Sequence, residues 1–339
     1  TSLMLSSLAL GTVITMSSFH WLLAWIGLEL NTLAIIPIIA KQHHPRATEA
    51  ATKYFLIQAA ASATVLFSSI TNAWYTGTWD ITQLTSQPAC IMLTLALSMK
   101  LGLAPLHFWL PEVLQGTTLK TAMIIATWQK LAPMGLLYLI YPALHPATLL
   151  TLGVLSTLVG GWGGLNQTQT RKIMAYSSIA HLGWMATILT LAPNIMILNL
   201  ALYLMMTLSM FMVLIMSSSK TVKDLTTTWS TSPTMAPLML ILLMSLGGLP
   251  PLTGFMPKWL ILQELTSHGL TVMATTIALS ALLSLFFYLR LSYVAALTLS
   301  PTTPQHKLKW RFRPKVKTAV MATTLILSTL LLPITPTLM

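Results

Sequence analysis

The chain has few charged residues: Asp, Glu, Lys and Arg make up 7% of its 339 residues, whereas 55% are hydrophobic. A soluble protein of this length could not cover its surface with so few charges. The formal net charge of +12 does not indicate nucleic-acid binding, because the basic residues stand singly inside apolar stretches or in short connections. We therefore expect an all-α, polytopic membrane protein that forms one transmembrane domain over residues 1–339.

Cysteine is almost absent, since Cys90 is the single one in the sequence. Disulfide bonds within the chain and iron–sulfur clusters held by cysteines are therefore excluded. The glycines show neither a Rossmann nor a P-loop spacing, and His43-His44 has no cluster of acids or cysteines nearby. We expect no redox centre, cofactor or metal on this chain.

Apolar stretches separated by Pro, Asn, Gly or charged residues predict about eleven transmembrane helices. Basic residues support this number, because they gather in every second connection, including the run 307–317, and the other connections hold none. By the positive-inside rule, the face with the N-terminus and these basic connections is the cytoplasmic or matrix side. The expected helices cover residues 2–18, 20–40, 49–73, 89–109, 117–140, 147–165, 172–191, 195–217, 234–263 (broken near 247–254), 270–297 and 318–337.

Five basic residues lie inside the expected spans: Lys53, Lys100, Lys130, Lys258 and Arg290. A lysine at the centre of a bilayer costs about 2.5–3.5 kcal/mol, so a helix that only formed a wall would avoid it. The long side chain of Arg290 can place its charge at the membrane face that carries the basic connections, and Lys53 lies about one helical turn inside the same face. For both residues a position at the membrane boundary remains an alternative to a functional role. Lys100, Lys130 and Lys258 lie too deep for that, and we expect them to carry protons.

Three further ionisable side chains lie in apolar surroundings: Glu29, His107 and His181. Glu29 is the one acidic residue deep in a span, and pairing with a lysine would keep both groups charged. A buried lysine with a movable carboxylate partner can bind and release a proton, because attraction favours its charged form and desolvation favours its neutral form. His107, seven residues after Lys100, and His181 are either proton relays or hydrogen-bonded packing residues.

Two spans are interrupted by prolines in a similar way, near residues 99–112 and 247–258. Proline costs about 3 kcal/mol in a helix interior, and broken helices of this kind are typical of transporter cores. Because the two copies fall in the fourth and ninth expected spans, they would cross the membrane in opposite directions. We therefore predict an inverted-topology repeat, with two unrelated proline kinks as the alternative. At an offset of 146 the identical pairs are Gly102 and Gly248, Leu103 and Leu249, Pro105 and Pro251, Leu106 and Leu252, and Pro111 and Pro257.

Together these features predict a lateral row of ionisable groups, Glu29, Lys100, Lys130 and Lys258, that passes protonation changes along the membrane. Proton translocation is the function that such a row favours. A free-standing sodium/proton antiporter is the alternative within transport. A structural membrane scaffold is the alternative outside transport, and apolar replacement of the lysines without effect would favour it.

The interrupted spans and three neighbouring blocks carry a family resemblance. The blocks are Gly102-Leu-Ala-Pro-Leu-His-Phe-Trp-Leu-Pro-Glu112, Trp128-Gln-Lys-Leu-Ala-Pro133, Gly163-Gly-Leu-Asn-Gln-Thr168, Met174-Ala-Tyr-Ser-Ser-Ile179 and Ser245-Leu-Gly-Gly-Leu-Pro-Pro-Leu-Thr-Gly-Phe255. They resemble subunit 2 of the mitochondrial NADH:ubiquinone oxidoreductase (complex I) family, over essentially the whole chain. In that family Glu29 would match the buried glutamate, Lys100 and Lys258 the lysines of the two broken helices, and Lys130 the central lysine.

The resemblance implies an antiporter-like membrane-arm subunit of the mitochondrial inner membrane, with its basic connections on the matrix side. Its partners would be other membrane-arm subunits of complex I and membrane lipids, cardiolipin among them. NADH, FMN, iron–sulfur clusters and ubiquinone would be bound by other subunits, so that NADH oxidation would occur elsewhere in the assembly.

Overall fold

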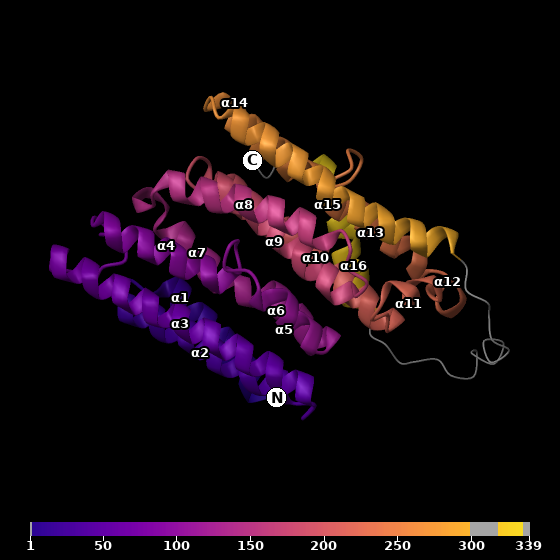
Figure 1. Ribbon diagram of the computed structural model, residues 1–339, viewed down its shortest axis with the longest axis horizontal. Coiled ribbons are helices and arrows are strands. Elements are labelled where there is room, and N and C mark those ends of the chain that lie inside the picture. The colour runs from indigo at the N-terminus through magenta and orange to yellow at the C-terminus, as the bar shows by residue number, and fades with distance from the viewer. Residues whose placement is uncertain (1, 299–317, 335–339) are drawn as a thin grey trace. The chain divides into compact units, whose positions relative to one another are not determined.

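The computed structural model describes residues 2–298 and 318–334, which form α-helices joined by short connections (Figure 1). The β-type contacts among these residues are two isolated bridges, His20 with Asp80 and Gln169 with Thr221. The basic run 307–317 and the end of the last expected helix lie outside the described residues. The expected all-α class is confirmed.

The helices differ widely in length. In chain order they are α1 (Ser2–Ser17), α2 (Trp21–Ala40), α3 (Pro45–Thr76), α4 (Gln87–Leu101), α5 (Trp109–Gly116), α6 (Leu119–Thr127), α7 (Leu131–Leu139), α8 (Pro146–Gly164), α9 (Thr170–Ile188), α10 (Pro193–Ser217), α11 (Val222–Thr226), α12 (Thr228–Thr231), α13 (Met235–Gly247), α14 (Phe255–Ser267), α15 (Thr271–Leu297) and α16 (Ala319–Leu330), with 3-10 turns η1 (Trp128–Lys130), η2 (Tyr141–Ala143) and η4 (Leu332–Ile334). In length and composition α2, α3, α8, α10 and α15 are able to cross a membrane, whereas α1, α4, α13 and α16 are apolar but shorter.

Serine and threonine are frequent in these apolar helices, and most of their hydroxyl groups donate to a carbonyl of the same helix. Thr15 Oγ1 donates to the carbonyl of Thr12 (2.8 Å), and Ser156 Oγ donates to the carbonyl of Gly153 (2.7 Å). Such a bond satisfies the hydroxyl without disturbing the helix ladder. A hydroxyl-rich helix can therefore lie in an apolar environment without an unpaired donor.

The described chain divides into two compact units. Among the described residues, unit 1 holds 2–159 and 178–196, and unit 2 holds 160–177, 197–298 and 318–334. In unit 1, α8 and α9 cross where each carries a glycine. A Cβ on Gly183 would lie 2.8 Å from the carbonyl oxygen of Gly153 and 2.3 Å from Ser156 Oγ. The crossing therefore requires glycine at position 183, as is usual where membrane helices approach closely.

In unit 2 the short helix α11 begins with a capping box. Thr221 Oγ1 accepts from the N–H of Asp224 (3.3 Å), and the Asp224 carboxylate accepts from the N–H groups of Thr221 (2.8 Å) and Lys220 (3.0 Å). Burial alone would raise the pKa of Asp224, but these hydrogen bonds and the charge of Lys220 outweigh it and hold the pKa below its ordinary value. Asp224 is thus charged at neutral pH and fixes the start of α11.

Two expected helices have different bounds in the structure. The helix expected over 89–109 ends at Leu101, because Gly102 adopts a left-handed conformation, and the chain becomes helical again only at Trp109. His107 consequently lies in a connection and not on a helix. The helix expected over 117–140 is divided by the 3-10 turn η1.

Two of the prolines expected to break helices do not break them. Pro111 and Pro257 are the third residues of α5 and α14. In the first turn of a helix the backbone N–H has no partner within the helix, so a proline there removes no hydrogen bond. The interruptions lie before these prolines.

Candidate functional site

The segment between α4 and α5 ends one helix and begins another within unit 1. The N–H of Gly102 donates to the carbonyls of Ser98 (2.9 Å) and Met99 (3.2 Å), a cap that a glycine with φ 80° permits. Trp109 then returns to the same helix end, and its Nε1 donates to the carbonyl of Met99 (3.1 Å). The carbonyls of Ser98 and Met99 are thereby satisfied although the helix stops in an apolar stretch.

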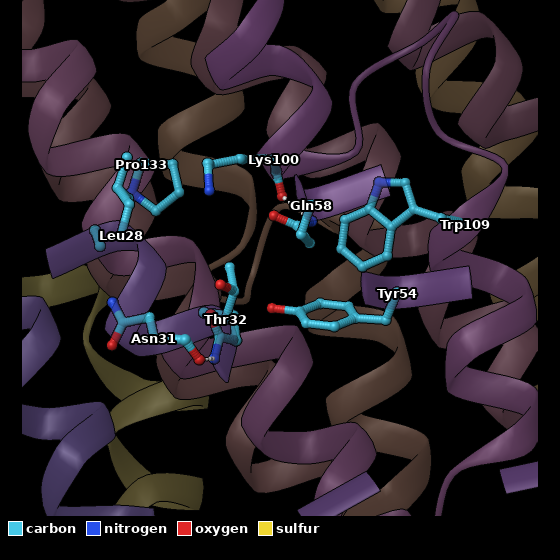
Figure 2. Close-up of a pocket in the computed structure, with 10 residues that line it drawn as sticks. Leu28, Asn31, Thr32, Tyr54, Gln58, Lys100, Trp109 and Pro133 are labelled. Carbon is cyan, nitrogen blue, oxygen red and sulfur yellow. Dashed lines mark hydrogen bonds between the residues drawn. The ribbon is translucent and has the colours of Figure 1, made fainter. Parts of the chain in front are cut away.

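Lys100 lies in the last turn of α4 and is 5% exposed. Its Nζ is buried and has no hydrogen-bond partner among the described residues. Figure 2 shows the amine pointing in among the side chains that line a cavity. The volume of this cavity is about 10 Å³, close to the space that one water molecule requires. The cavity is lined by Leu28, Asn31, Thr32, Tyr54, Gln58, Lys100, Trp109, Gln129, Ala132 and Pro133.

Neutral polar side chains converge on this cavity from several elements. Tyr54 and Gln58 lie one turn apart on α3, and Gln58 Nε2 donates to the carbonyl of Lys100 (3.4 Å). Gln129 Nε2, from η1, donates to the carbonyl of Asn31 (3.3 Å). The side-chain amide atoms of Asn31 are buried without a partner in the described part of the chain. A small cavity with such groups is suited to an ordered water molecule.

Glu29 lies on α2 between the cavity-lining residues Leu28 and Asn31 and is half-buried. Its Oε2 is buried and has no partner among the residues that the structure describes. The carboxyl group is close enough to Lys100 for its charge to act on the amine, but the described ion pairs do not include these two groups. A carboxyl and an amine in this relation can exchange a proton through an intervening water.

Lys130 is the last residue of η1 and is 2% exposed. A 3-10 turn inside a helical stretch changes the direction of the side chains around it. Gln129 before Lys130, and residues 132–133 after it, line the Lys100 cavity. Unit 1 thus places a second buried lysine next to residues of the same cavity.

In unit 2, α13 and α14 are also separated by a glycine-capped break. The N–H of Gly248 donates to the carbonyl of Ser245 (3.0 Å). Lys258, in α14, returns to the end of α13, where its Nζ donates to the carbonyl of Gly247 (2.7 Å). A cation is favoured at the C-terminal end of a helix, because the unpaired carbonyls and the helix dipole are negative there. The second interruption therefore binds its lysine through the backbone, unlike the first.

The two interruptions begin and end at matching positions when the chain is aligned at the offset of 146. Gly102 has φ 80° and ψ 40°, and Gly248 has φ 78° and ψ 44°. The helix before each break ends immediately ahead of this glycine, and the helix after it begins seven residues later, at Trp109 and Phe255. At this offset Glu112 occupies the place that Lys258 has in unit 2.

The remaining expected residues, His107, His181 and Lys53, do not line the cavity. His107 is buried, with Nδ1 3.2 Å from the carbonyl oxygen of Pro105 and its ring centre 4.3 Å from that of Phe108. His181 is buried in α9, and Lys53 is ion-paired at the surface. Their roles in proton transfer stay predictions.

The neutral polar residues of the cavity were not expected from the sequence. The sequence does contain a signal for them. Tyr54 and Gln58 are four residues apart in an otherwise apolar stretch, and Asn31 and Thr32 come two and three residues after Glu29, within one helical turn. Polar residues at helical spacing near a buried charge would have marked this face.

Comparisons with known families match nearly the whole chain, over residues 18–339. A family model described as NADH:quinone oxidoreductase/Mrp antiporter, TM matches residues 18–284. A second, described as NADH dehydrogenase subunit 2 C-terminus, matches residues 285–339. A protein of Xenopus laevis named NADH-ubiquinone oxidoreductase chain 2 is 60% identical over 335 residues, which cover 99% of this chain and 97% of that protein. A protein of the same name from Oncorhynchus mykiss is 58% identical over 99% of this chain and 96% of that protein.

Solved structures agree with this. A chain in respiratory complex I from Thermus thermophilus superposes with a TM-score of 0.84 at 29% identity, covering 98% of this chain and 79% of that one. A chain in the Mrp complex from Dietzia sp. superposes with a TM-score of 0.83 at 18% identity, covering 98% of this chain and 74% of that one. At that low identity the second likeness concerns the fold alone.

Proposed function

The chain belongs to the NADH:quinone oxidoreductase/Mrp antiporter transmembrane family, as a homologue of NADH-ubiquinone oxidoreductase chain 2, and on this basis we propose how it moves protons. It is a membrane subunit of a proton-translocating respiratory NADH:ubiquinone oxidoreductase. Its own contribution is proton translocation by buried Lys and Glu side chains. NADH, FMN, iron–sulfur clusters and ubiquinone are bound by the other subunits with which it assembles.

The observation that carries this proposal is the Lys100 amine, which is buried without a hydrogen-bond partner among the described residues and faces a water-sized polar cavity. An ammonium held in this way costs several kcal/mol unless it is hydrated or shares its charge with a carboxylate. A water in the cavity would connect the amine with nearby polar groups, and Glu29 would supply the compensating charge. Lys100 then gains and loses a proton as Glu29 approaches or withdraws.

The proton path proposed here is a lateral row of Glu29, Lys100, Lys130 and Lys258. The hydrogen bond from Lys258 to the Gly247 carbonyl supports the place of Lys258 in the row, because a carbonyl at a helix end stabilises the charged amine. Movement of this helix end would break the hydrogen bond and release the amine. In this scheme His107 and His181 pass protons to or from the row, and Lys53 does so at the boundary of the membrane.

We also propose eleven membrane spans with an inverted-topology repeat. The equal backbone angles and equal spacing of the two interruptions support the repeat. In this arrangement the N-terminus and the basic connections face the mitochondrial matrix, and the protein resides in the inner membrane as a single domain. The basic connections would contact anionic lipid such as cardiolipin.

The test replaces Lys100 by Met in the assembled complex. Lys100→Met removes the proton-binding amine and puts an apolar side chain of similar length in its place. We therefore expect the complex to assemble normally but to lose NADH-driven proton translocation. Lys120→Met, an exposed lysine at the start of α6, is the matched control and should translocate protons normally. Undiminished translocation in Lys100→Met would contradict the proposal and favour a structural role. Exchange of protons for sodium by the isolated chain in liposomes would favour a free-standing antiporter.

A further inference from the structure

Lys53 lies between two carboxylates at the surface of unit 1. Its Nζ pairs with Glu49, one turn earlier on α3, and with Glu112 Oε2 on α5 at 2.8 Å. The side chains are 40% exposed for Lys53, 61% for Glu49 and 51% for Glu112. This charge cluster does not line the Lys100 cavity, and the proton path described above uses only Lys53 from it.

The ion pair lies in the middle of the contact between α3 and α5. One turn before Glu112, the ring of Trp109 packs edge-on against Tyr54, with ring centres 5.7 Å apart. One turn after it, Gly116 lies on the backbone of α3, since a Cβ there would be 2.7 Å from the carbonyl oxygen of Arg46. The two helices thus run antiparallel along one shared face, with an aromatic contact, an ion pair and a glycine contact in sequence.

α5 is only eight residues long and therefore depends on these contacts for its position. Two of the residues that meet at its beginning, Trp109 and Tyr54, line the Lys100 cavity. Lys53 is the residue next to Tyr54, and Glu112 is three residues after Trp109. The ion pair therefore joins α3 and α5 beside a cavity-lining residue on each helix.

We propose that Glu112 is a positioning residue for the Lys100 cavity, because its ion pair with Lys53 holds α5, and with it Trp109, in place. In a variant that lacks the Glu112 carboxylate, Lys53 keeps Glu49 as a partner, so that loss of the pair leaves no cation unpaired on α3. The proposal rests on the proposed role of the cavity in proton transfer.

The experiment uses the assembled complex with Glu112→Gln, and Glu49→Gln as the matched control. Amide hydrogen exchange followed by mass spectrometry reports on the stability of α5 directly. In Glu112→Gln we expect exchange over residues 109–116 to rise about two- to five-fold, as for the loss of an exposed ion pair, and NADH-driven proton translocation to slow. Glu49→Gln should leave both unchanged, because Lys53 then pairs with Glu112 alone.

A charge reversal, Lys53→Glu with Glu112→Lys, separates positioning from other effects. It restores the ion pair and should restore the exchange rate of α5, which is the deciding readout because Lys53 itself is placed at the boundary of the proton path. Failure of the reversal to restore the exchange rate, or unchanged exchange in Glu112→Gln, would overturn the proposal. If Glu112→Gln does not assemble, recovery of assembly in the reversed pair supports the proposal, and no recovery overturns it. Full translocation by Lys100→Met would refute the cavity's role, while the exchange result would still decide whether Glu112 holds α5.

Discussion

Gly254→Ala is the substitution with the most severe steric consequence at the second interruption. Gly254 has φ −65° and ψ −15°, which alanine adopts without strain, so its effect comes from the added methyl group alone. That methyl group would lie 1.8 Å from the carbonyl oxygen of Ser245 and 3.3 Å from the sulfur of Met206. Since backbone atoms cannot turn aside as a side chain can, α13 and α14 must separate by about 1 Å or more.

The separation affects two hydrogen bonds at this point. The Ser245 carbonyl accepts the cap bond from Gly248, and the Gly247 carbonyl accepts from Lys258. Overpacking costs about 1–3 kcal/mol, and loss of a hydrogen bond to a charged group costs about 1.5–3 kcal/mol. We expect Gly254→Ala to destabilise the packing of α14 against the end of α13 by about 3–5 kcal/mol.

Gly247→Ala is the matched control within the same interruption. A methyl group there meets Leu285 Cδ1 at 2.8 Å, the end of a flexible side chain, and Gly247 is the last residue of α13. Alanine also has a higher helix propensity than glycine, by about 1 kcal/mol in a helix interior. The two effects nearly cancel, so the control should change stability by about 1 kcal/mol or less.

The assay is amide hydrogen exchange over residues 255–262 in the assembled complex, together with NADH-driven proton translocation. Gly254→Ala should expose these amides and reduce translocation, whereas Gly247→Ala should do neither. Equal exchange in the two variants would refute the reasoning, because it would mean that the contact of Gly254 with the Ser245 carbonyl does not determine where α14 lies.

Two further predictions concern positions away from the lysines. Gly183→Ala would place its methyl group 2.8 Å from the Gly153 carbonyl oxygen, so we expect a loss of about 1–3 kcal/mol in thermal stability of the complex; an unchanged melting temperature would show that α8 and α9 can separate freely. Because the pKa of Asp224 is lowered in the fold, its stabilisation of α11 is complete above the pKa of an unfolded aspartate and is lost as the pH falls through the lower value of the folded state. The protection factors of residues 222–226, which correct exchange for the pH dependence of the intrinsic amide rate, should therefore fall on acidification in the wild type but show no such transition in Asp224→Asn.

The positions of the apolar helices follow closely from the sequence, since long uncharged stretches and helix-ending residues were both visible there. The sites of both interruptions were also visible, because Gly102 and Gly248 precede proline-rich segments. The details of the breaks were not. Pro111 and Pro257 looked like helix breakers, although in a first turn proline is harmless, and the 3-10 turn at Lys130 has no distinct composition.

Charged side chains in apolar spans could be singled out from the sequence, whereas the neutral side chains around Lys100 could not. Glu29, Lys100, Lys130 and Lys258 stood out because a charge in an apolar span is costly. Asn31, Tyr54 and Gln58 carry no such cost signal, and their convergence on one cavity depends on how α2, α3 and the end of α4 are placed in space. The partner of Glu112 could not be read from sequence for the same reason, since it lies on another helix.

The length of α3 has a consequence for the surface ion pair. The helix has 32 residues, and from Tyr54 to Thr76 it contains no Asp, Glu, Lys or Arg. At 1.5 Å per residue this uncharged part is about 34 Å long, enough to cross the roughly 30 Å hydrocarbon layer without help from the preceding turns. We therefore expect Lys53 and Glu49 to lie at the level of the lipid headgroups, in contact with the aqueous phase. Dissolved ions reach the Lys53–Glu112 pair there and weaken it, so that the mobility of α5 should depend on ionic strength while the buried lysines remain shielded from it.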